Sequence, residues 1–177
     1  MSFVLKNLDQ RTRELMFDEV DRDVAEGRLY MSLRFTPAGM ASWEMLFRAA
    51  CQSGDEVSLT AALGAPGGVH LNAREASSTS ISGDKAVPPN AAATVAEGEF
   101  NRFYIRALCR RALDDGAGLE IYRARASSNP DSASEAKIGE LIDAQAVLDD
   151  LRVNIGVAPA LGLPSHPNTG LSVFLVA

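Results

Sequence analysis

Residues 99–115 read EFNRFYIRALCRRALDD, and this stretch decides how the rest of the chain folds. On a helical wheel at about 100° per residue, Arg102, Arg106 and Arg110 share a narrow polar arc with Glu99. Nearly all the other positions carry apolar side chains, whereas a surface helix normally has an apolar stripe over only part of its circumference. The pattern therefore predicts a central helix over 99–115 that is buried on most sides.

Three other stretches have the patterns of strands. Apolar residues alternate along 29–35 (LYMSLRF) and 119–125 (LEIYRAR), as in half-buried strands. The run 171–176 (LSVFLV) is apolar on both faces, which is typical of a buried strand. Together with the central helix they predict an α+β fold, with a small mixed or antiparallel sheet packed around that helix.

Capping residues mark several further helices. Asp9 is a good N-cap for a helix that ends near residue 26, Thr36 is followed by proline, and Asp143 precedes a short apolar pattern. Residues 55–63 also have the length of a short helix. Apolar residues recur around Trp43 at steps of three and four, so we expect this side chain to anchor the core.

Length and composition are those of a globular protein. The chain has 177 residues, of which 46% are hydrophobic and 23% charged, so we expect a single domain over residues 1–177. The formal net charge of −6 argues against a chain that coats nucleic acid, because phosphate binding needs concentrated lysine and arginine. The chain shows no leader peptide and no apolar run long enough to span a bilayer. We therefore predict a soluble protein with no membrane contact, either cytoplasmic or part of a particle assembled in the cytoplasm.

The segment 64–90 differs from the rest in composition. It is rich in glycine, serine, alanine and proline and shows no apolar period. A connection of this length is uncommon within a compact domain, and it usually serves as a functional arm, a lid or a disordered linker. We predict an extended loop or arm that contacts another copy or a partner.

Enzyme motifs are missing from the sequence. The glycine-rich start of the 64–90 segment lacks the Lys-Ser/Thr of a phosphate loop, and no GxSxG, HExxH or paired CxxC occurs. His70 and His166 lie in loop-like stretches. Cys51 and Cys109 each fall on the apolar side of a predicted helix, which favours reduced, buried thiols. The sequence therefore predicts no catalytic residue, no cofactor and no metal site.

The arginines are the feature that stands above this background. Arg102, Arg106 and Arg110 follow one another at steps of four along the central helix, and Arg123 and Arg125 share one face of the next strand. These five residues are the candidate partner-binding site. One interpretation is that they form ion pairs with the acidic helix near the N-terminus and with Glu97 or Glu99. The other is a surface for a ligand or for nucleic acid, which guanidinium groups recognise well.

Two functional hypotheses follow from these patterns. The first is a non-enzymatic structural or interaction protein, a subunit of a larger assembly such as a virus particle or another oligomer. Such a subunit would make its contacts through the 64–90 arm and the C-terminal strand, with protein partners that include copies of itself. The alternative is a nucleic-acid-binding or nucleic-acid-processing protein that uses Arg102, Arg106 and Arg110.

Overall fold

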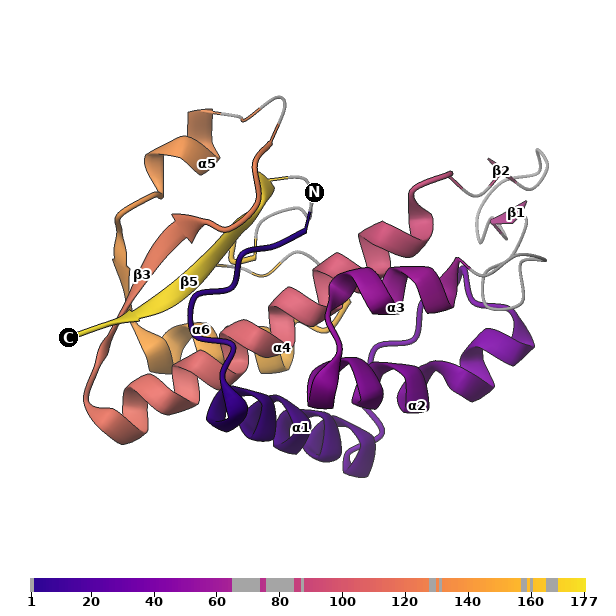
Figure 1. Cartoon of the computed structure of the whole chain (residues 1–177), viewed down its shortest axis with the longest axis horizontal. Coiled ribbons are helices and arrows are strands. Elements are labelled where there is room, and N and C mark those ends of the chain that lie inside the picture. Colours follow the sequence, from indigo (N-terminus) through magenta and orange to yellow (C-terminus); the bar gives the residue numbers. More distant parts are fainter. Residues whose placement is uncertain are drawn as a thin grey trace.

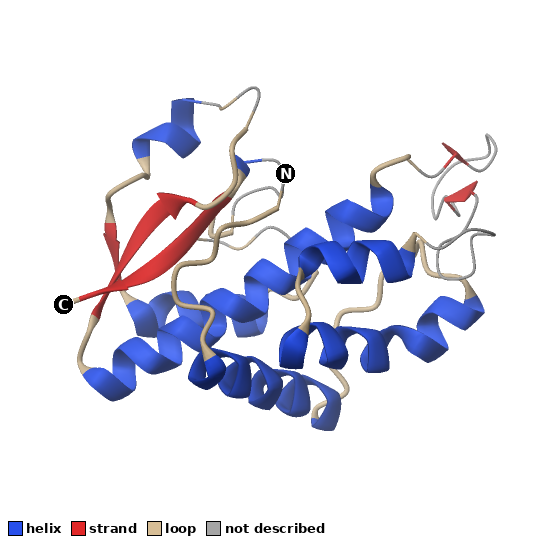
Figure 2. Cartoon of the chain, in the orientation of Figure 1, coloured by secondary structure: helices blue, strands red, loops and turns tan. Residues whose placement is uncertain are grey.

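The chain has an α+β fold organised around one long helix, as the sequence predicts. In the computed structural model this helix is α4 (Ala91–Asp115), and it runs from a group of helices to a small sheet at the other end of the molecule (Figures 1 and 2). The structure describes residues 2–64, 74–75, 85–86, 88–127, 130, 132–156, 159, 161–164 and 169–177.

Helix α4 is buried along most of its length. Phe100, Phe103, Ile105 and Leu108 have almost no exposed surface, which confirms the predicted central helix. The helix begins at Ala91 rather than at residue 99, because the alanines that precede the predicted start are strong helix formers. It ends at Gly116, whose φ of 66° is the left-handed conformation that closes helices.

The other long helices begin at the predicted capping residues. Asp9 accepts a hydrogen bond from the Thr12 amide at the start of α1 (Gln10–Ala25), and Thr36 caps α2 (Pro37–Ser53). Asp55 forms a capping box at α3 (Glu56–Leu63), and Asp143 caps α6 (Ala144–Val153). Helices α1, α3 and α6 pack along α4, while α2 packs against α1 and α3. A short helix, α5 (Ser132–Ala136), lies beside the sheet.

The sheet has three antiparallel strands in the order β4-β3-β5. Strand β3 (Gly118–Arg123) and strand β5 (Leu171–Val176) confirm two of the predicted strands, with Ile121 opposite Val173. The edge strand β4 (Leu141–Ile142) is too short to have been predicted from alternation. A separate pair joins β1 (Arg74–Glu75) to β2 (Lys85–Ala86).

The predicted strand over residues 29–35 is wrong. The Phe35 amide donates to the Ser32 carbonyl at 3.1 Å, so the chain turns there instead of continuing extended. Alternation would bury Met31 and Leu33, yet both are exposed, Leu33 by 77%. Of that face only Phe35 is fully buried, because the turn leads its ring into the core just before the cap of α2.

Aromatic rings join the helices in the core. Trp43 of α2 lies 5.0 Å from both Phe35 and Phe47 between ring centroids, and Phe47 contacts Phe103 of α4 edge-on at 4.9 Å. Such pairs stabilise a core beyond the area they bury. Trp43 is therefore the predicted anchor, whereas Met40, which continues the same spacing, is exposed.

The segment before α1 crosses the sheet and is held there mainly through its main chain. The Tyr122 hydroxyl donates to the Val4 carbonyl at 2.7 Å and accepts from the Lys6 amide at 3.2 Å. The Asn7 amide donates to the Tyr104 hydroxyl at 3.3 Å, and the Asn7 side-chain oxygen accepts from the Leu175 amide at 3.0 Å. These bonds tie the segment to α4, β3 and β5 at once.

Most of the predicted arm over 64–90 lies outside the described residues, and its contact with another copy stays a prediction. Among the helices that are described, none has the length and apolar character needed to cross a bilayer.

Candidate functional site

Arg106, at the centre of the predicted arginine set, is completely buried between α4 and α1. Its guanidinium group donates from Nη1 and Nη2 to the two carboxylate oxygens of Asp23, at 2.7 and 2.8 Å. Its Nε donates to Glu19 Oε2 at 2.8 Å. A buried guanidinium needs bidentate partners of this kind to offset the loss of its hydration.

Glu19 also binds a second arginine, which comes from α6. Arg152 Nε donates to Glu19 Oε2 at 3.0 Å, so one carboxylate links three helices. Glu19, Asp23, Arg106 and Arg152 form what we call the buried ion-pair cluster. Arg110 lies at its edge, 3.3 Å from Asp18 and 3.4 Å from Glu19. The first interpretation of the arginines, ion pairing with the acidic helix, is thus confirmed for Arg106 and Arg110.

Arg102 lies one turn before Arg106 and is also buried. It donates to the Asn154 carbonyl at 2.8 Å, and its Nε lies 3.6 Å from the carboxylate of Glu99. Glu99 is therefore only loosely paired. Burial, partly offset by the charges of Arg102 and Arg106, raises the pKa of Glu99 above its ordinary value of 4.5.

We expect Glu99→Gln to leave the free energy of unfolding at pH 7 unchanged or higher. Because its folded-state pKa is raised, charged Glu99 destabilises the fold as the pH rises from about 4.5 through that pKa. The neutral amide avoids this cost, so the advantage of the variant should grow with pH. Urea unfolding of both proteins across pH 4 to 8 measures this difference in the free energy of unfolding. A variant whose stability falls below that of the wild type as the pH rises would contradict the prediction.

Glu19→Gln is the matched control, and its effect should have the opposite sign. Burial alone would raise the pKa of Glu19, but hydrogen bonds from Arg152 and the charge of Arg106 outweigh burial and lower it below 4.5. The paired carboxylate therefore contributes stability above about pH 4.5, and this is lost as the pH falls through the lowered pKa. We expect a loss of about 1–3 kcal/mol at pH 7, the cost of leaving buried groups unpaired, that shrinks in acid.

The two arginines near the sheet are engaged as well. Arg123 Nη2 donates to Glu135 at 2.6 Å, and its Nη1 donates to the Thr169 carbonyl. Arg125 pairs with Glu97 at 3.2 Å, one of the two partners that the sequence suggests. The five predicted arginines lie at two places in the fold, along α4 and at the C-terminal end of β3. All of them bind groups of their own chain, so phosphate would have to displace these partners. Their role in binding a partner stays a prediction.

Sequence reasoning missed the acidic half of the ion-pair cluster. Glu14, Asp18 and Asp21 lie on the solvated side of α1 and are exposed. Sequence reasoning does not single out Glu19 and Asp23, which are buried. Both alternate with Met16 and Val20 in an i, i+3, i+4, i+7 pattern, so their position on the apolar face could have identified them.

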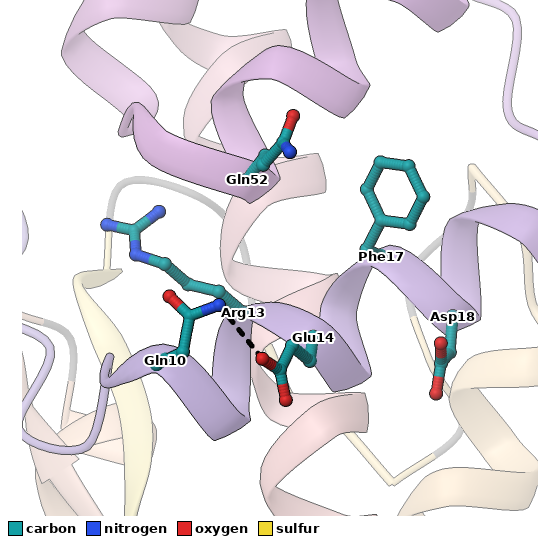
Figure 3. A pocket seen from close by; sticks show the side chains of 6 residues that line it. All are labelled: Gln10, Arg13, Glu14, Phe17, Asp18 and Gln52. Atoms are coloured by element: carbon teal, nitrogen blue, oxygen red, sulfur yellow. Dashed lines mark hydrogen bonds between the residues drawn. The ribbon is translucent and has the colours of Figure 1, made fainter.

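A small pocket opens between α1 and α2 (Figure 3). It has a volume of about 200 Å³. Its lining consists of Gln10, Arg13, Glu14, Phe17, Asp18 and Gln52. Arg13 uses Nη1 to bind the carbonyls of Cys51 and Gly54, at 3.1 and 3.0 Å. Arg13 therefore caps the C-terminal end of α2 by donating to its last carbonyl groups, which is a structural role.

The two cysteines lie in the core. Cys51 and Cys109 are free and buried, as predicted, and burial raises the pKa of each to about 12. Both remain protonated at neutral pH, and a thiol reacts as a nucleophile only after deprotonation. No group of three or more His, Cys, Asp or Glu able to hold a metal occurs among the residues that the structure describes. His70 and His166 lie outside them.

The edge of β5, predicted to take part in assembly, is occupied by side chains of the same chain. Asn101 Nδ2 donates to the Leu171 carbonyl at 2.8 Å, and the Tyr104 hydroxyl donates to the Val173 carbonyl at 3.2 Å. The Leu175 amide is bound by Asn7. A strand from another molecule could add at this edge only after these bonds were broken.

The outer face of α2 is an exposed apolar surface. Ala38, Ala41, Met45 and Ala49 recur at helical spacing on the side opposite Trp43, and all are exposed, Met45 by 65%. The inner side of the same helix is in the core, so α2 is apolar on both sides. A helix of that kind normally has a neighbour on each side.

Comparison with protein-family models, with curated proteins and with solved structures finds no match to this chain.

Proposed function

We propose that the chain is a non-enzymatic structural or interaction protein, a subunit of a larger assembly such as a virus particle or another oligomer. The observation that carries the proposal is the exposed outer face of α2, where Ala38, Ala41, Met45 and Ala49 leave apolar surface in water. Contiguous apolar surface outside the core usually marks a contact with another protein.

The arginines support this proposal indirectly. A nucleic-acid surface needs guanidinium groups that can reach phosphates, and their exchange for counterions makes affinity fall steeply with salt. Arg106 instead has no exposed surface and forms ion pairs with Glu19 and Asp23. The nucleic-acid alternative therefore has less support than protein–protein contact.

The mass in solution separates the two functions. We expect sedimentation to show species larger than the monomer, and we expect added DNA or RNA to leave their mass unchanged at both 50 and 200 mM salt. As a probe of the alternative, Arg110, Arg123 and Arg125 are each changed to glutamate, because these three are only partly buried. Micromolar binding of nucleic acid that these changes abolish, with the fold intact, would overturn the proposal.

A further inference from the structure

We infer that the outer face of α2 binds the same face of a second copy, with the two helices antiparallel and crossing near Met45. The inference rests on the proposed subunit function and names its partner and its contact surface. We call the contact surface the α2 stripe. It consists of Ala38, Ala41, Ser42, Met45, Ala49 and Gln52.

The α2 stripe carries no charged side chain over four helical turns. Each copy has a net charge of −6, so two copies repel one another across most of their surfaces. The charged residues of α2 are Glu44 and Arg48, and both lie along one edge of the stripe, on the side of α1. They pair with each other at 2.8 Å, and Arg48 also pairs with Asp21. Two copies can therefore meet at the stripe without bringing unpaired carboxylates together.

Antiparallel pairing makes the α2 stripe complementary to itself. A two-fold axis through Met45 places Ala41 of one copy opposite Ala49 of the other, because both residues are four positions from the axis. Alanines on both helices allow the close interaxial approach seen in packed helices. The same axis brings Glu44 and Arg48 of both copies to one edge, where each Arg48 also pairs with Asp21 of its own chain. Parallel pairing would leave these charges on opposite edges.

A negative charge at the centre of the α2 stripe tests the inference. We expect the wild-type chain to sediment as a dimer and Met45→Glu to weaken dimerisation by at least tenfold, with an unchanged circular-dichroism spectrum. Met45 is 65% exposed, so the variant should still fold. The control is Val153→Glu on α6, which is 68% exposed and should leave the dimer intact.

A cysteine at the two-fold axis tests the geometry. Met45→Cys should form a disulfide-linked dimer under mild oxidation, whereas Val153→Cys should not, and the native thiols are buried and will not interfere. A dimer that Met45→Glu leaves intact would overturn the α2 inference and leave the subunit function standing. A wild-type chain that stays monomeric at every concentration would overturn the α2 inference and also self-assembly as the function.

Discussion

Replacing Arg106 by alanine is expected to lower the free energy of unfolding by about 3–5 kcal/mol, the usual cost of removing one partner from a buried ion pair. Asp23 and Glu19 are both buried and would lose the guanidinium group that holds them at 2.7 and 2.8 Å. Arg152 could compensate only Glu19, because its side chain donates its hydrogen bonds to that carboxylate. Urea denaturation followed by circular dichroism gives the loss directly.

Arg11→Ala is the control for this measurement. Arg11 makes a bidentate bond to Asp115 at 2.8 and 2.9 Å, so the bond lengths match those of Arg106, but the pair lies in solvent. Exposed ion pairs contribute little to stability, and we expect this variant to unfold close to the wild type. Equal losses in the free energy of unfolding for the two variants would show that burial of the cluster does not contribute to stability, and would contradict the prediction.

Leu108→Ala should cost about 2–5 kcal/mol, the range for large-to-small changes in a core that cannot collapse around the cavity. Leu108 is completely buried on α4, between elements that pack on several sides of that helix. The same denaturation measurement applies. A loss within about 0.5 kcal/mol, typical of surface positions, would contradict the central place of α4.

Leu113→Ala is the matched control for that experiment. It makes the same substitution on the same helix, five residues later, where the side chain is partly exposed. The change in intrinsic helix propensity is identical, so the difference between the two variants isolates burial. We expect Leu113→Ala to be much the milder of the two.

Much of the fold could be predicted because the signals for it are local. Asp9, Thr36 and Asp143 each cap a helix as expected, since a capping side chain satisfies amides only three residues away. The apolar residues of 99–115 are likewise visible in the sequence. Their distribution around the helical wheel indicates that α4 is covered on most sides. No information about distant residues is needed for either inference.

Two parts of the fold depend on distant partners and could not be predicted. The alternation of residues 29–35 is that of a strand, but the chain turns at Ser32, whose carbonyl accepts a hydrogen bond from the Phe35 amide. Strand β4 has only two residues and exists because β3 lies beside it. Propensity gives way to tertiary context in both cases.

The candidate site was predicted only in part, for a related reason. The arginine spacing on α4 is visible in the sequence, and an acidic helix was the expected partner. The position of α1 against α4 decides which carboxylates pair with the arginines. In this position Glu19 and Asp23 face Arg106, and their exposed neighbours do not. The sequence does not indicate the open face of α2, because alanine is common at both buried and exposed positions of a helix.

The segment that crosses the sheet before α1 sets an order of events during folding. Its bonds join Lys6 to Tyr122 and Asn7 to Leu175, across 116 and 168 positions of chain. Closing such long loops is entropically costly until the partners are in place, and contacts of this range slow folding. The ribosome makes the segment before these partners, and the segment can dock only after they are in place. Until β5 has been synthesised, the side-chain oxygen of Asn7 lacks the Leu175 amide from which it accepts a hydrogen bond in the folded chain.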